Sequence, residues 1–309
     1  MVSMYQIIDW EGDMIVRVLL LALVVMLIGA VLYRGVLTRA TPQADLMAST
    51  VAARRHAVLG GSLAIGAASG AGLATFFVAE AVGGPRLFGV PGLLMVLVPG
   101  AAGLAHLAVL ALTEHTWPHP TGRVRAARLA PRGIRNVIPT VLGFVLVAAA
   151  LVLLAAVTAG ALLAAPDGRS IAVQHGSTGA SAGPFPGLTD GLAALASVGV
   201  LLIVSVLVLR LVVGRPAVEG ADELTDAALR RASAHRVLRG ALAGTLLTLG
   251  PLLAFGGSAA AQAHDGAPKA IAVTVAVVGL AVVVAGLVAW FLPAPNVPLP
   301  SGATPATAR

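Results

Sequence analysis

The sequence predicts an all-α protein, a polytopic bundle of about seven transmembrane helices whose N-terminus is outside and whose C-terminus is cytoplasmic. First, 58% of its 309 residues are hydrophobic and only 11% are charged, whereas soluble domains carry roughly 25% charged residues. Second, apolar runs recur along the chain with about the 20 residues needed to cross roughly 30 Å of hydrocarbon. Third, arginines gather in alternate connecting segments, as the positive-inside rule requires.

Seven apolar runs are long enough to span a bilayer. They occupy residues 14–33, 57–82, 90–113, 137–165, 192–213, 241–261 and 270–292. The runs are continuous rather than alternating, which favours helices over the strands of a barrel. The first run has no basic segment before it and no cleavage site after it, so we expect it to be retained. We therefore expect one transmembrane domain, 1–292, followed by a proline-rich, disordered cytoplasmic tail, 293–309.

The placement of basic residues sets the orientation. Fourteen of the nineteen arginines lie in residues 34–56, 114–135 and 214–239, which we expect to be cytoplasmic. The opposite side receives only four basic residues: Arg17, Arg86, Arg169 and Lys269. The abundance of alanine, glycine and valine, with arginine in place of lysine, indicates a bacterium with a GC-rich genome. We expect a multi-pass protein of the cell (plasma) membrane.

Two connecting segments have their own predictions. Acidic residues begin the 222–239 segment and basic residues end it, which complements a helix dipole, and Asp226 with Arg230 is a favourable i,i+4 pair. We expect a helix of about four turns on the inner membrane surface, where its basic residues bind anionic lipid headgroups or a partner protein, unless the segment is a solvated connector. These residues are Arg230, Arg231, Arg236 and Arg239. The Gly- and Ser-rich segment 166–189 is predicted to be a mobile outer loop.

Small residues predict where helices approach closely. Gly66 with Gly70 and Gly240 with Gly244 form two GxxxG motifs, which allow close backbone contact within a bilayer. We expect tight packing inside the chain or, alternatively, a homodimer. Pro99 and Pro251 are far enough inside their runs to kink the helices.

A faint internal repeat connects the two halves of the chain. Residues 56–61, His-Ala-Val-Leu-Gly-Gly, enter the second span, and residues 235–240, His-Arg-Val-Leu-Arg-Gly, enter the sixth. Both segments run from inside to outside, so a duplication would be parallel, with three spans, a linker span and three more.

The seven-span layout with an outside N-terminus resembles that of seven-span sugar transporters and PQ-loop proteins, and Pro42-Gln43 supplies the dipeptide. In that family the motif lies within a membrane helix, whereas here it lies in a charged loop. The second half has Arg215-Pro216-Ala217 instead, so no residue role is carried over.

Few ionisable groups fall within the predicted spans, where each costs roughly 2.5–3.5 kcal/mol. Arg17 and Glu80 lie near the outer ends of the first two spans and form a candidate ion pair at the opening of a cavity. Alternatively, each side chain reaches water independently. His106, in the inner half of the third span, is either a hydrogen-bonded structural histidine or a proton relay or ligand.

No motif names an activity. The chain has no cysteine, and no Walker, GxSxG, HExxH or GxGxxG constellation occurs. His115 and His119 have a metal-like spacing, but Pro118 and Pro120 oppose a helix there, so we expect no metal and no cofactor.

The function classes left open are a non-catalytic membrane scaffold or accessory subunit, a small-solute permease and a membrane-embedded enzyme. We favour the scaffold, because nearly all charge lies in the connecting segments. A permease should show a mid-membrane cavity lined by the second, third and sixth spans. The expected partners are the lipid bilayer and a membrane protein or a second copy, and not nucleic acid.

Overall fold

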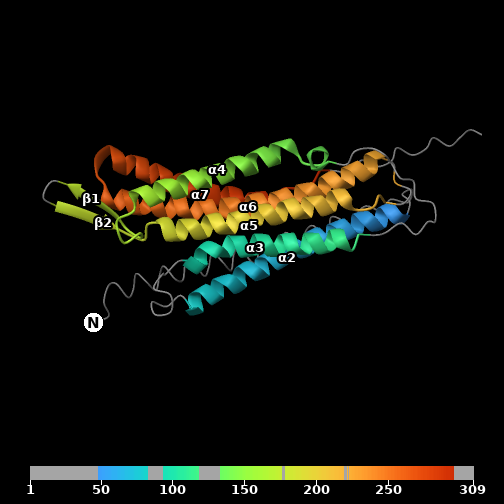
Figure 1. Ribbon diagram of the computed structural model, residues 1–309, viewed down its shortest axis with the longest axis horizontal. Helices are drawn as coiled ribbons and strands as arrows, with labels where there is room; N and C mark the ends of the chain where they lie inside the picture. Colours follow the sequence, from blue (N-terminus) through green and yellow to red (C-terminus); the bar gives the residue numbers. More distant parts are fainter. Residues whose placement is uncertain are drawn as a thin grey trace, which may run out of the picture. The chain divides into compact units, whose positions relative to one another are not determined.

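The computed structural model describes residues 48–82, 93–117, 133–175, 178–218, 221 and 223–295. This part contains six helices that are long and apolar enough to cross a membrane (Figure 1). They are α2 (Ala48–Val82), α3 (Leu93–His115), α4 (Thr140–Leu163), α5 (Leu188–Gly214), α6 (Glu223–Ala263) and α7 (Gly266–Phe291). A 3₁₀ turn, η1 (Ile134–Asn136), precedes α4.

Each of the six helices overlaps one of the last six predicted spans, so a largely helical, membrane-type fold is confirmed for them. The first predicted span, 14–33, and the tail beyond residue 295 lie outside the described residues. The count of seven, the orientation and the parallel repeat therefore stay predictions.

Helix α6 is the centre of the bundle. In its most apolar stretch 67% of the residues are buried, against 33% or less in the other five helices. It packs along α7 and also contacts α4, α3 and α5, whereas α2 packs mainly on α3 (Figure 1). The peripheral helices α4 and α7 expose large apolar side chains instead. Exposed apolar side chains suit helices that face lipid, because the lipid interior is as apolar as a protein core.

The contact between α6 and α7 is a seam of glycines. Gly250 and Gly257 are seven residues apart on α6, and Gly279 and Gly286 have the same spacing on α7. A Cβ atom at Gly250 would lie 2.9 Å from the Gly279 carbonyl oxygen, and one at Gly279 would lie 2.7 Å from the Gly250 carbonyl oxygen. The two antiparallel backbones therefore touch around Gly250 and Gly279, with no room for a side chain at either position.

The two predicted GxxxG motifs have different surroundings. A Cβ atom at Gly240 would meet the His106 ring of α3, and one at Gly244 would lie 2.8 Å from Leu201 of α5. No described atom lies within 4 Å of such a Cβ position at Gly66 or Gly70, which are exposed. Close packing by this second pair stays a prediction.

The 222–239 segment does not form a separate helix on the membrane surface, which corrects our expectation. Its described residues begin α6, which continues to Ala263 without a break. At 1.5 Å per residue, 41 residues span about 60 Å, roughly twice the hydrocarbon thickness. No glycine or proline interrupts the stretch from Glu223 to Arg239, and packing on neighbouring segments buries most of it.

The 166–189 segment holds a β-hairpin, where the sequence predicted a mobile loop. Strand β1 (Ile171–His175) pairs antiparallel with β2 (Thr178–Ala182), so that Ile171 lies opposite Ala182. Ile171 and Phe185 pack on Ala259 and Ala263 of α6.

A turn stabilised by Asp167 leads into β1. Its carboxylate accepts the backbone N–H groups of Arg169 and Ser170, each at 3.0 Å. These hydrogen bonds, that from Arg169 first, hold the pKa of the exposed Asp167 carboxyl below its ordinary value. The pairing, the apolar anchors and this turn together hold the described residues of the segment in place.

Candidate functional site: a buried arginine cluster

The most polar buried region lies where α3 and α5 end and where α2 and α6 have their first turns. We call it the arginine end, and the opposite end, with β1 and β2, the hairpin end. At the arginine end, a small apolar cluster contains Ala53 and Ala57 from α2, Leu229 from α6, and Trp117 and Val218, which follow α3 and α5. Segments far apart in the sequence are thus packed against each other, and the arginines lie among them.

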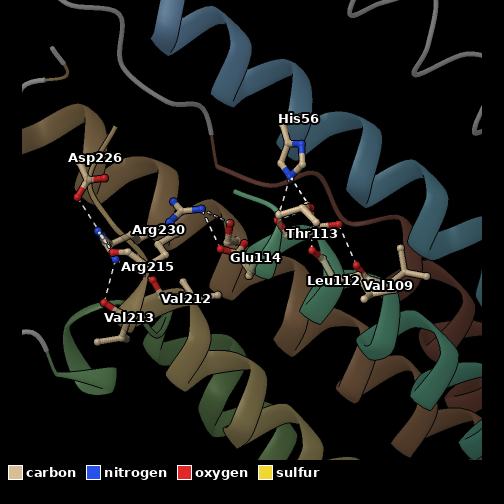
Figure 2. Close-up of polar contacts among 12 residues, drawn as sticks. His56, Val109, Leu112, Thr113, Glu114, Val212, Val213, Arg215, Asp226 and Arg230 are labelled. Atoms are coloured by element: carbon tan, nitrogen blue, oxygen red, sulfur yellow. Dashed lines mark hydrogen bonds and ion pairs between the residues drawn. The ribbon is translucent and has the colours of Figure 1, made fainter. Parts of the chain in front are cut away.

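The centre of the cluster is an ion pair between Arg215 and Glu114. The Arg215 Nη1 atom lies 2.9 Å from Glu114 Oε2, and the two side chains are only 1% and 5% exposed. The guanidinium also lies over the Trp117 ring, 3.5 Å from its centroid. Figure 2 shows the Arg215–Glu114 pair beside the ends of α3 and α5. Burial lowers the pKa of Arg215, and the Glu114 carboxylate opposes that shift.

His56 connects α2 to the same cluster. Its Nε2 atom lies 2.9 Å from the Thr113 carbonyl oxygen, and its ring meets Trp117 edge-on at 5.7 Å between centroids. Since a carbonyl only accepts, Nε2 carries the proton in this arrangement. Figure 2 shows this contact from α2 to the last turn of α3.

Arg230 of α6 caps the end of α5. It donates hydrogen bonds to the carbonyl oxygens of Val212, Val213 and Arg215 at 2.8–2.9 Å. The last carbonyl oxygens of a helix have no hydrogen-bond donor within the helix and carry partial negative charge. An arginine provides both the donors and the positive charge. Its Nε atom also donates to Asp226 at 2.9 Å, which confirms the predicted i,i+4 pair (Figure 2).

Arg239 makes the equivalent contact to α7. Its Nη1 atom donates to the carbonyl oxygen of Leu292 at 2.6 Å, and Leu292 is the C-cap residue of α7. The whole residue is 1% exposed. Helix α6 therefore provides one arginine to the end of each of two neighbouring helices, which fixes their positions along the bundle.

The four arginines predicted to dock on lipid headgroups or a partner differ in exposure. Arg230 and Arg239 are buried with partners inside the protein, Arg236 is partly buried beside Gly61, and Arg231 is exposed. A headgroup contact requires an accessible guanidinium. The docking role stays a prediction, and this burial restricts it to Arg231 and the accessible part of Arg236.

His106 lies deeper in the bundle, fully buried where α3, α6 and α7 meet. Its Nε2 atom is 3.3 Å from the Arg236 carbonyl oxygen, and its ring meets Trp290 edge-on at 5.8 Å between centroids. The ring fills the space above Gly240. The Nε2 contact suits a hydrogen-bonded structural histidine, whereas the buried Nδ1 atom has no hydrogen-bond partner among the described residues. The structural role and the relay or ligand role both stay predictions.

The other predicted site is not visible as a pair. Arg17 lies outside the described part of the chain, and Glu80 belongs to α2 but its side chain is not described. Their ion pair stays a prediction. Among the described residues, no three or more His, Asp or Glu side chains lie close enough to hold a metal ion.

Comparisons of this chain with protein-family models, curated protein sequences and solved structures gave no match.

Proposed function

We propose that the chain is a non-catalytic, multi-pass membrane scaffold or accessory subunit. The observation that supports this most is the closed contact between α3 and α6 in the centre of the bundle. The His106 ring occupies the space above Gly240, and Leu201 of α5 reaches both Gly103 and Gly244. A permease that passes solute between the second, third and sixth spans needs a cavity here. Close packing favours a fixed frame instead.

The arginine cluster supports the same proposal. Arg230 and Arg239 cap neighbouring helices, and Arg215 pairs with Glu114 inside the protein. These charges thus bind the helices to each other, although Arg215 Nε and Nη2 are buried without a hydrogen-bond partner among the described residues. A rigid frame with an apolar outer surface suits a protein that positions others in the bilayer.

The exposed face of α2 is the partner surface that we propose. Gly66 and Gly70 lie on one side of the helix with Leu63, which is 66% exposed, and Phe77, which is 63% exposed. Spacings of three, four and seven residues bring them onto one face. Small residues flanked by large apolar ones allow another helix to approach closely, so we propose a membrane protein or a second copy as the partner.

Purification in native-lipid nanodiscs tests this proposal. We expect the tagged wild-type chain to retain a stoichiometric membrane-protein partner or a second copy, and a Gly66→Leu, Gly70→Leu variant to lose it. Gly199→Leu is the matched control, since that glycine also has no described atom within 4 Å of its Cβ position but lies on α5. If the protein purified as a monomer without a partner and transported a small solute in proteoliposomes, the scaffold proposal would be wrong and the permease function would be favoured.

A further inference from the structure

A cavity of about 540 Å³ lies at the hairpin end of the bundle. Helices α4, α6 and α7 form three of its walls, and β1 with Phe185 and Pro186 forms the fourth. Ala159 of α4, Gly256 and Ala260 of α6 and Ile271 of α7 are among its lining residues. Small residues on α4 and α6 leave this volume unfilled. The scaffold proposal does not use the cavity.

The lining makes water a poor occupant. His264 is the one polar side chain among the described residues that line the cavity, and its Nδ1 atom is already 2.8 Å from the Ala260 carbonyl oxygen. An ordered water needs two to four polar partners, and this almost entirely apolar wall is poorly suited to supply them. The volume is within the roughly 300–1,000 Å³ range of binding sites for small apolar molecules. Hydrocarbon is therefore the fitting occupant.

The position of the cavity indicates where that hydrocarbon comes from. Leu163 of α4 and Ile271 of α7 line it, and both are largely exposed on the outside of the bundle, at 59% and 66%. In a bilayer these side chains contact acyl chains, so the cavity is bordered by lipid. An acyl chain can enter between α4 and α7 without crossing water.

Charge beside the cavity suits a phosphate. Lys269 is exposed in the first turn of α7, next to the lining residue Pro268. Helix α7 begins there, and its N-cap, Asp265, makes no side-chain capping hydrogen bond, so its first N–H groups add partial positive charge. The Asp265 carboxylate is the opposing charge on this turn. A phospholipid combines an acyl chain with an anionic phosphate, so one molecule can place its hydrocarbon in the cavity and its phosphate beside Lys269.

We propose that this cavity binds one acyl chain of a phospholipid from the leaflet at the hairpin end, with its phosphate beside Lys269. The bound lipid completes the wall between α4 and α7. This binding site is independent of the partner surface on α2.

Photolabelling of the full chain tests the proposal. The protein is placed in nanodiscs that contain phosphatidylglycerol with a diazirine on one acyl chain, and labelled peptides are mapped by mass spectrometry. We expect labels on α4, α6 and α7 around the cavity, measured relative to labels on the exposed face of α2. Ala159→Phe should reduce this ratio by at least about tenfold, which corresponds to about 1.4 kcal/mol.

Matched variants separate the two parts of the proposal. Ala155→Phe, one turn away on α4, exposed and not part of the lining, should leave the labelling ratio unchanged. Lys269→Gln should reduce it about fivefold, the equivalent of about 1 kcal/mol for one surface lysine, and Lys269→Arg should preserve it.

Two results would overturn the proposal. Equal labelling of the Ala159→Phe and wild-type proteins would remove the acyl chain from the cavity. If diacylglycerol carrying the same diazirine chain labels as well as phosphatidylglycerol, and Lys269→Gln has no effect, no phosphate is recognised.

Discussion

Substitution of Gly279 by leucine should prevent α7 from packing on α6 and leave little folded protein. A Cβ atom at this position would meet the backbone nitrogen of Ala254 and lie 2.7 Å from the Gly250 carbonyl oxygen. Backbone atoms within a helix cannot move aside as a flexible side chain can, so the two helices must separate. We expect a loss of about 3 kcal/mol or more in the free energy of unfolding, at or above the usual range for overpacking. Equilibrium unfolding in mixed micelles measures this loss.

Gly199→Leu is the control for that substitution. It places the same side chain in the middle of helix α5, where no atom of the described residues lies within 4 Å of the Cβ position. We expect a small change, since leucine also has a better helix propensity than glycine. If Gly279→Leu unfolded at the same denaturant concentration as Gly199→Leu, the direct backbone contact between α6 and α7 would be wrong.

Glu114→Ala should have the second large effect, because it leaves the buried charge of Arg215 without its partner. Breaking a buried ion pair on one side costs about 3–5 kcal/mol, and both side chains here are almost completely buried. Thermal unfolding of the purified protein should show a correspondingly lower midpoint. Arg231→Ala, at an exposed position of α6, should change stability by no more than about 0.5 kcal/mol.

A double variant distinguishes the ion pair from a mere loss of packing. Glu114→Ala combined with Arg215→Met removes both charges, while methionine keeps an apolar contact with Trp117. We expect the double variant to be more stable than Glu114→Ala alone, since no uncompensated charge remains buried. If the losses of the single variants Glu114→Ala and Arg215→Met added up to that of the double variant, the two side chains would not interact.

The positions of the helices could be predicted because a bilayer imposes a length and a polarity on each span. The same reasoning failed at the start of α6. Charged residues such as Arg230 and Arg239 interrupt the apolar pattern that marks a span. Both are nevertheless buried, because each donates at least one hydrogen bond to a carbonyl oxygen at the end of another helix. Such caps depend on where the neighbouring helices end, and a single segment does not contain that information.

Two further elements depend on packing between distant residues. The glycine seam has a spacing of seven on both helices, and this period was a usable signal that the shorter GxxxG motifs obscured. The hairpin was missed because β2, Thr-Gly-Ala-Ser-Ala, has low β-propensity. Its order arises from pairing with β1 and from the contact of Ile171 and Phe185 with α6.

The candidate site could be predicted only in part. The Asp226–Arg230 pair follows from helical spacing, and His106 was singled out by its depth. No motif singles out Glu114, whose partner, Arg215, is 101 residues away. Neither spacing nor composition connects residues at that separation, and only the packing of α3 against α5 does.

The central claim is that these helices cross a membrane with the arginine end in the cytoplasm. Single-cysteine labelling tests it directly, because the wild-type chain has no cysteine and provides an unlabelled background. Ser181→Cys lies on the exposed face of the hairpin, and Arg231→Cys is exposed at the arginine end. In intact cells a membrane-impermeant maleimide should label Ser181→Cys and should reach Arg231→Cys only after permeabilisation. Labelling of Arg231→Cys in intact cells, with Ser181→Cys protected, would contradict the orientation and the anchoring role of the arginines.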